Sequence, residues 1–260
     1  MEFSVQSGPL CARCGDRLDA PILTSGPSSA GLCRVCRLVP PPFARAVAYG
    51  PYQGRMRAAI HALKYDRLHP AARKLGKMLA QAIAQLAPEA PAEMLAIPIP
   101  LHRSKAAERG SNQARALAAY ALESLRKTHP QWRLTLDERV LVRQRSTASQ
   151  AGLTFRQRRL NLRGSFAVCD SATVEARDIL LIDDILTTGA TVRAASQALL
   201  RAGVASVWVA TLARAARMQP IRLGVSVAFD DAEDNSLSGS TPAATLQPAS
   251  ILSSQDQPSF

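Results

Sequence analysis

Long apolar runs are missing from this chain of 260 residues. The longest, VASVWVATLA at 204–213, is far shorter than the roughly 20 apolar residues that a membrane-spanning helix needs. The N-terminal segment MEFSVQSGPLCARCG also lacks the basic stretch and following apolar stretch of a secretory signal. We therefore expect a cytoplasmic protein without a membrane span.

Two familiar phosphate-binding motifs are absent as well. The chain contains neither GxxxxGKS or GxxxxGKT nor GxGxxG after an expected strand. Their absence counts against a P-loop NTPase and against a dinucleotide-binding Rossmann domain. No Ser/His/Asp or Cys/His set typical of nucleophilic catalysis is recognisable either. A phosphate site in this chain would therefore use a different local sequence.

Cysteine is scarce, and four of the five cysteines form two pairs. Cys11 and Cys14 lie in CARC, Cys33 and Cys36 lie in CRVC, and 18 residues separate the pairs. Disulfides rarely persist in a reducing cytoplasm, and this spacing is typical of a structural zinc site with four protein ligands. Residues 8–38 hold too few large apolar side chains for a core of their own, so the metal would supply folding free energy. Four unligated core cysteines are the alternative.

Basic residues outnumber acidic residues by 32 to 20, which gives a formal net charge of +12. No lysine or arginine follows Arg222, whereas five acidic residues do. The segment up to Arg222 therefore carries 32 basic and 15 acidic residues, a net charge of +17. Such a charge favours an anionic partner, such as a phosphate, a nucleic acid or an acidic protein surface. A soluble arginine-rich surface is the alternative, because charge alone is weak evidence for nucleic-acid binding.

The spacing of apolar residues predicts an α/β fold with a parallel sheet flanked by helices. Two strands, 178–183 and 204–213, are apolar on both faces and flank a helix, which indicates a βαβ unit of buried parallel strands. Further strands are expected at 94–100, 133–144 and 164–168. Helices are expected around Met56 to Leu63, at Leu75 to Leu86, at 111–125 with Ser111 as N-cap, and at 190–203 closed by Gly203.

Two features outside these elements complete the expectations. The fifth cysteine, Cys169, has no partner in the sequence pattern and is expected to be a small buried side chain. From Asp231 onward the chain is rich in serine, proline, glutamine and small residues, so 231–260 is expected to be a disordered tail.

The stretch ILLIDDILTTGAT at 179–191 places two adjacent acids directly after a buried strand. In an open parallel sheet, ligands bind outside the carboxyl ends of the strands, so Asp183 and Asp184 are expected at that edge. The next turn leads into a helix N-terminus, whose free amides attract anions, and Gly189 permits a positive φ. A ribose 5-phosphate would satisfy both halves, with its hydroxyls on the acids and its phosphate in the turn. A solvated acidic turn that caps a helix is the alternative.

The same stretch resembles the phosphoribosyl pyrophosphate (PRPP) signature of type I phosphoribosyltransferases. More specifically, residues 8–216 resemble the ComF (competence protein F) family, in which a cysteine zinc module precedes a phosphoribosyltransferase-like domain. Other matching stretches are AIHALKYDRL, IPIPLHRSKAAERGSNQA and RSTASQAGLTFRQRRLNLRGSF. The resemblance implies a zinc-binding module at 8–40 and a phosphoribosyltransferase-like domain at 43–217.

The resemblance also assigns roles to residues. Asp183 and Asp184 would bind the ribose hydroxyls, directly or through a magnesium ion. The 5-phosphate would be held by Thr187, Thr188, Gly189, Ala190 and Thr191. The pyrophosphate would face His102, Arg103, Lys105 and Arg109, and Arg109 would act with the two aspartates in the transfer.

An arginine-rich segment, Arg139 to Arg163, contains seven arginines and no acidic residue. By resemblance, its part from Arg143 to Arg163 corresponds to a flexible hood loop that closes over bound substrate. Arginines would then stabilise the negative charge that builds on a departing pyrophosphate once water is excluded. A solvated helix face and a nucleic-acid-binding strip are equally open alternatives.

These observations lead to three hypotheses of function. The first is a PRPP-binding protein that transfers a phosphoribosyl group to an unidentified acceptor with magnesium, linked to DNA uptake. The second is a nucleic-acid-binding module of the DNA uptake machinery, with single-stranded DNA or a DNA-uptake helicase as partner. The third is a PRPP sensor or scaffold without catalysis.

Overall fold

The computed structural model describes residues 3–5, 7–18, 31–65, 69–102, 104, 107, 112–144, 162 and 164–216, except for the side chains of 64, 65, 69 and 70. These residues belong to one compact unit, Met1–Gln219. The second unit, Pro220–Phe260, contains none of them, so the predicted tail lies outside the described residues.

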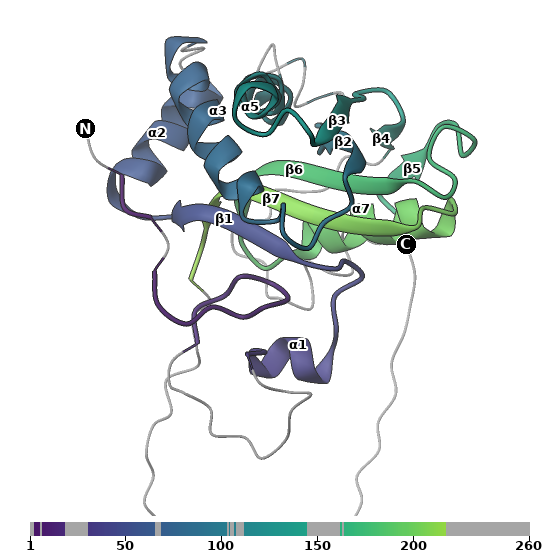
Figure 1. Cartoon of the computed structure of the whole chain (residues 1–260), viewed down its shortest axis with the longest axis horizontal. Helices are drawn as coiled ribbons and strands as arrows, with labels where there is room; N and C mark the ends of the chain where they lie inside the picture. Colours follow the sequence, from purple (N-terminus) through teal and green to yellow (C-terminus); the bar gives the residue numbers. More distant parts are fainter. Residues whose placement is uncertain are drawn as a thin grey trace, which may run out of the picture. The chain divides into compact units, whose positions relative to one another are not determined.

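Five parallel strands form the central sheet (Figure 1). Their order across the sheet is β1 (Ala46–Pro51), β7 (Ser206–Arg214), β6 (Asp178–Leu186), β2 (Glu93–Pro98) and β3 (Arg133–Leu136). Every neighbouring pair in this sheet is parallel. The predicted α/β class and the predicted parallel pairing of the two longest strands are therefore confirmed.

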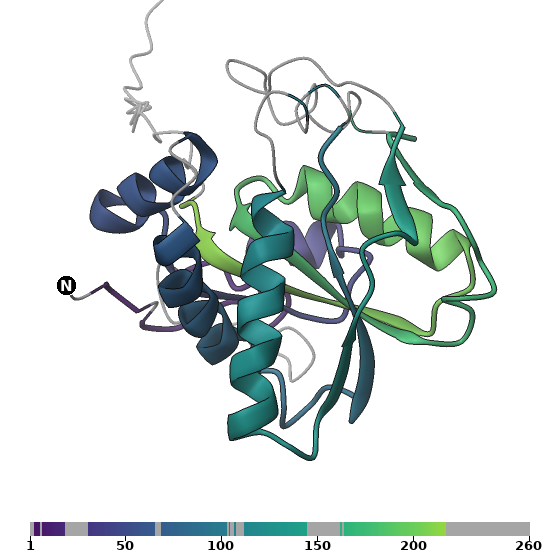
Figure 2. The same cartoon turned by 90° about the horizontal axis from the view of Figure 1, so that it is seen from above.

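Helices cover both faces of the sheet, since its central strands are apolar on both sides. Leu180 and Ile182 of β6 pack in one hydrophobic cluster, and Ile179 and Leu181 pack in the other. The first cluster includes residues of α2 (Gly54–Tyr65), α3 (His69–Ala84) and α5 (Gln113–Thr128). The second includes residues of α7 (Ala190–Arg201) and of α1 (Arg34–Leu38). Figure 2 shows α3 and α5 side by side on their face.

A second, two-stranded sheet joins β4 (Leu141–Arg143) and β5 (Phe166–Val168) in antiparallel register. The segment 133–144, expected as one strand region, is thus divided between two sheets. The reason is a turn at Asp137, whose carboxylate accepts hydrogen bonds from the amides of Arg139 and Val140. This turn ends β3 and redirects the chain into β4.

Three further expectations are corrected by the structure. The N-cap of α5 is Asn112 and not Ser111, because the Asn112 carboxamide accepts a hydrogen bond from the Ala114 amide at 3.1 Å. Cys169 is exposed and not buried, because β5 ends at Val168 and Cys169 begins the following turn. Strand β6 extends to Leu186, three residues beyond the predicted end.

Strand β1 has no counterpart among the expected strands. Its sequence is AVAYGP, which ends in glycine and proline. These two residues are common in turns and loops, so the local pattern resembles a loop. Pairing with β7 from Ala46 to Pro51 makes it a strand.

Gly203 follows the end of α7 as predicted and has a left-handed backbone conformation, with a φ of 89°. Among the described residues, no helix is both long and apolar enough to cross a membrane.

Candidate functional site

The strand order reverses direction between β2 and β6. After β2 the chain passes through α5 to β3 on one side, and after β6 it passes through α7 to β7 on the other. The two connections cover opposite faces, since α5 and α7 belong to different clusters. In open α/β sheets, a crevice forms at such a point outside the carboxyl ends of the strands. The carboxyl ends of β2 and β6 are therefore where a ligand is expected.

The two aspartates are the sixth and seventh of the nine residues of β6 and are half-buried. Asp183 is paired with Thr211 of β7, and its Oδ1 accepts a hydrogen bond from the Asp184 amide at 2.9 Å. Because side chains alternate along a strand, Asp183 shares the face of Ile179 and Leu181, and Asp184 follows on the opposite face. Near its carboxyl end, β6 thus presents one carboxylate on each face of the sheet.

The turn after β6 leads into α7 through a left-handed residue. Gly189 is the N-cap of α7, with φ 78° and ψ 7°. The Thr188 hydroxyl accepts a hydrogen bond from the Ala190 amide at 3.2 Å, and Thr187, Thr188 and Thr191 are half-buried. The first turn of α7 contains no acidic residue. A helix N-terminus of this kind presents unpaired amides and the positive end of the helix dipole to an anion.

The segment after β2 lies beside the acid-bearing end of β6. Pro98 is in register with Ile182, and the Ile99 amide donates to the Ile182 carbonyl at 2.8 Å. The chain continues to His102, which is half-buried and whose Nδ1 lies 2.9 Å from the Ser104 hydroxyl. The other three residues expected to face pyrophosphate lie outside the described residues: Arg103, Lys105 and Arg109.

Asn112 ties this segment to α5. Its side chain caps the helix through Oδ1, and its Nδ2 donates a hydrogen bond to the Ile99 carbonyl at 3.1 Å. One carboxamide therefore connects Ile99, directly after β2, with the start of α5. Ser111 was predicted as the N-cap in place of Asn112, although asparagine directly before a helical pattern is a recognised N-cap signal.

Arg143 brings a positive charge to the same region. It is the last residue of β4, and its guanidinium lies 5.5 Å from the centre of the Phe166 ring in β5. Burial lowers the pKa of Arg143, and the negative charge of Asp183 acts in the opposite direction. The expected hood loop therefore starts at an arginine that interacts with Asp183. The rest of the loop, apart from Gln144 and Leu162, lies outside the described residues.

The four paired cysteines form a second candidate site. Their sulfurs all lie within 4.8 Å of one another, and the sulfurs of Cys14 and Cys33 are 3.7 Å apart. Four sulfurs placed tetrahedrally about zinc at its usual bond length are about 3.8 Å apart. None of these four described cysteines is joined in a disulfide. They can hold one metal ion, and both donor type and spacing fit zinc.

The thiols of this cluster perturb one another strongly. Hydrogen bonding to Cys14 holds the pKa of Cys11 far below its usual value. The pKa of Cys33 is lowered to about 6, since Cys14 and Cys36 outweigh the opposing effect of Cys11. The pKa values of Cys14 and Cys36 are raised, chiefly by Cys11. Thiols this close do not all ionise without a cation, so a metal ion would stabilise the fully ionised set.

The described parts of the segment that carries the four cysteines are 8–18 and 31–40, here called the cysteine segment. This segment packs into the core of the main sheet. Cys11, Cys14 and Cys36 are buried in the cluster that also contains Leu181 and Val209. The Ala46 amide at the start of β1 donates to the Arg13 carbonyl at 2.9 Å. A Cβ at Gly15 would lie 2.8 Å from the Ala46 carbonyl oxygen, so only glycine allows this approach.

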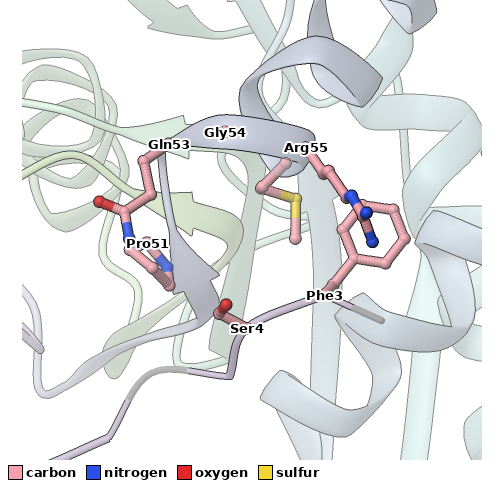
Figure 3. Close-up of a pocket in the computed structure, with 7 residues that line it drawn as sticks. Phe3, Ser4, Pro51, Gln53, Gly54 and Arg55 are labelled. Atoms are coloured by element: carbon pink, nitrogen blue, oxygen red, sulfur yellow. The ribbon is translucent and has the colours of Figure 1, made fainter. Parts of the chain in front are cut away.

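A cavity of about 300 Å³ lies at the end of β1, two strands away from β6 (Figure 3). Gln53 and Pro51 lie on one side of it, and Phe3 and Arg55 on the other. None of the residues predicted to bind a ligand lines this cavity. It is therefore separate from the acid-bearing end of β6.

Comparison with known proteins identifies related sequences. A family model described as Phosphoribosyl transferase domain matches residues 108–232. DNA utilization protein YhgH of Escherichia coli O157:H7 is 33% identical over 184 residues, which cover 70% of this chain and 77% of that protein. Competence protein F of Haemophilus influenzae is 28% identical over 218 residues, which cover 81% of this chain and 87% of that protein.

Solved structures also match part of this chain. A hypoxanthine phosphoribosyltransferase from Staphylococcus aureus covers 58% of this chain and 70% of its own at 18% identity. The TM-score of that match is 0.30, a similarity too low to support an argument about function.

Proposed function

Since this chain belongs to the ComF family, with DNA utilization protein YhgH and competence protein F, and carries a phosphoribosyl transferase domain, we propose that it binds PRPP. The ribose 5-phosphate part of the ligand lies at the carboxyl end of β6. The observation that carries this proposal is the sequence of half-buried acids, left-handed glycine and helix N-terminus along residues 183–191, at the point where the strand order reverses.

Each half of the sugar phosphate has a chemical partner in this arrangement. Carboxylates accept hydrogen bonds from the ribose hydroxyls, and they are the oxygen ligands that magnesium prefers. Asp183 and Asp184 would hold such an ion, which would offset negative charge on the pyrophosphate. The amides and hydroxyls of the Thr187–Thr191 turn donate to the 5-phosphate. We propose zinc as a separate, structural ion at the four cysteines.

We propose further that the protein transfers the phosphoribosyl group to an acceptor. The bond between C1 of the ribose and the pyrophosphate oxygen breaks, and C1 bonds to a nucleophile. Negative charge then builds on the pyrophosphate, where Arg143 and the arginines of segment 99–112 and of the expected hood loop would stabilise it. Release of pyrophosphate on addition of an acceptor tests this step, whereas PRPP binding without turnover favours a sensor.

Binding is tested by isothermal titration of PRPP with Mg²⁺ into the wild-type protein and the double variant Asp183→Asn/Asp184→Asn. Loss of charged hydrogen-bond partners is expected to weaken binding by at least about tenfold, from roughly 1.5–3 kcal/mol per such hydrogen bond. Asp178→Asn is the matched control, because Asp178 lies at the opposite end of the same strand and bonds the Ser206 hydroxyl. Folded wild-type protein that gives no binding would defeat the proposal.

The second candidate function is binding of single-stranded DNA. It is favoured by the net charge of +17 up to Arg222 and by the relative named DNA utilization protein. Contacts to phosphates release counterions, so affinity would fall with salt by a slope of roughly 0.7 per contact in a double-logarithmic plot. Fluorescence anisotropy of a labelled oligonucleotide at several salt concentrations measures this slope, and negligible affinity at low salt removes this candidate.

A further inference from the structure

A buried ion pair joins the cysteine segment to the end of β7. Arg214 is the last residue of β7 and only 3% exposed. Its Nη2 lies 3.3 Å from Oδ2 of Asp16 and 3.9 Å from the sulfur of Cys14. The pair therefore links residues that are about 200 positions apart in the chain, at one corner of the metal-binding cluster.

The backbone of Arg214 is fixed from both sides. It is in register with Pro51 of β1 and with Leu186 of β6, and its carbonyl accepts a hydrogen bond from the Tyr52 amide at 2.8 Å. The guanidinium thus projects toward the thiols from a rigid position in the sheet. A side chain held in this way loses little further entropy when it makes a directed interaction.

Charge explains what such a side chain does beside four cysteines. A zinc ion bound by four thiolates leaves the centre with two net negative charges, and burying such a charge is costly unless a cation lies nearby. The Asp16 carboxylate alone would add to that negative charge. The guanidinium supplies the opposite charge and an N–H donor at the Cys14 sulfur.

We propose that Arg214 is the charge-compensating partner of the metal centre, with its guanidinium directed at the Cys14 thiolate from the end of β7. Arg214 acts on the metal through a ligand and is therefore a positioning residue. The inference does not depend on the proposed PRPP site, because it concerns zinc binding alone. Partners of this kind commonly contribute ten- to a hundredfold to metal affinity.

A second arginine provides a matched control. Arg193 of α7 also attaches to the cysteine segment, but its guanidinium donates to the backbone carbonyls of Val39 and Pro40, at 3.0 and 3.3 Å. Substitution of either arginine by methionine removes one attachment of this segment and one positive charge. Arg214, in contrast, directs its guanidinium at a ligand sulfur, that of Cys14 at 3.9 Å.

The test is the zinc affinity of full-length variants, measured by competition with a chromophoric chelator. Arg214→Met is expected to lower the affinity by about ten- to a hundredfold, and Arg193→Met by less than about threefold. Circular dichroism of the zinc-loaded proteins shows whether each variant is folded. Equal affinities for the two variants would overturn the proposal.

The variant Asp16→Asn distinguishes compensation of the thiolate charge from attachment of the cysteine segment to β7. This variant breaks the same ion pair but removes a negative charge from the surroundings of the thiolates, so the proposal predicts unchanged or higher zinc affinity. If the ion pair served only to attach the segment, both partners' variants would lose affinity together. A fall in zinc affinity in Asp16→Asn therefore contradicts the proposal, even where Arg214→Met does not fold.

Discussion

Arg143 shows how one residue gains a role from its surroundings. Its guanidinium is held over Phe166 and interacts with Asp183, although the three residues come from β4, β5 and β6. The cation therefore lies close to the acid that we propose binds ribose. A positive charge at this point would favour an anionic ligand.

Replacement of Arg143 by methionine is expected to weaken PRPP binding by about tenfold or more, because a hydrogen bond to a charged group contributes roughly 1.5–3 kcal/mol. The measurement is isothermal titration with PRPP and Mg²⁺. Arg139→Met is the control, since Arg139 is exposed and belongs to the same arginine-rich segment. An equal loss in both variants would show that total charge matters and the position of Arg143 does not.

Gly189 is needed for its backbone conformation and not for lack of space. A Cβ there would meet its nearest neighbours, Leu186 and Val192, at ordinary contact distances of 3.8 and 3.9 Å. Its φ of 78°, however, costs an L-residue about 1–2 kcal/mol.

We therefore expect Gly189→Ala to lower the free energy of unfolding by about 1–2 kcal/mol in urea denaturation. Gln197→Ala, at an exposed position of the same helix, is expected to change it by less than about 0.5 kcal/mol. A Gly189→Ala protein as stable as the wild type would mean that the turn adopts another conformation in solution.

At the scale of elements, backbone pairing joins the carboxyl ends of β2 and β6. The hydrogen bond from Ile99 to Ile182 continues the pairing of the strands, and Asn112 fixes the same segment to α5. Segment 99–112, which carries three of the cationic candidates, is therefore anchored at Ile99 and at Asn112.

Two variants of Asn112 separate the helix cap from this anchor. Asn112→Asp keeps an acceptor for the Ala114 amide but cannot donate to Ile99, whereas Asn112→Ala loses both interactions. Asn112→Ala is expected to cost about 1 kcal/mol of stability through the cap alone, measured by thermal unfolding. Weaker PRPP binding in both variants would support the anchor, and unchanged binding in Asn112→Asp would argue against it.

At the scale of the whole unit, the cysteine segment shares its core with the sheet. Cys11, Cys14 and Cys36 pack with residues of β6 and β7, and Arg214 ties the same segment to the end of β7. The metal site is thus part of the packing of the larger domain, and loss of the metal should lower the stability of the sheet.

Removal of the metal by a chelator is therefore expected to lower the midpoint of thermal unfolding of the whole unit in a single cooperative transition. Differential scanning calorimetry of treated and untreated protein measures this change. A small separate transition, with the main midpoint unchanged, would show instead that the cysteine segment folds independently.

Structural features that depend on residues close together in the chain could be predicted from the sequence. The apolar run 179–182, the two acids and the glycine before a helical pattern predicted a buried parallel strand and a turn into a helix, and the structure has both. The spacing of the cysteines likewise predicted a cluster of four, and the four sulfurs do lie together. Each CxxC turn already places its two sulfurs side by side, so the cluster requires only contact between the two turns. Alternation and helical periods are local properties of a chain.

Only the tertiary structure decided which distant residues meet. Strand β1 exists because β7 pairs with it, Cys169 is exposed because β5 ends before it, and Arg143 and Arg214 acquire partners from other strands. The local pattern around each of these residues is compatible with several surroundings. Their environment follows from the order of strands in the sheet, and that order is a property of the folded chain as a whole.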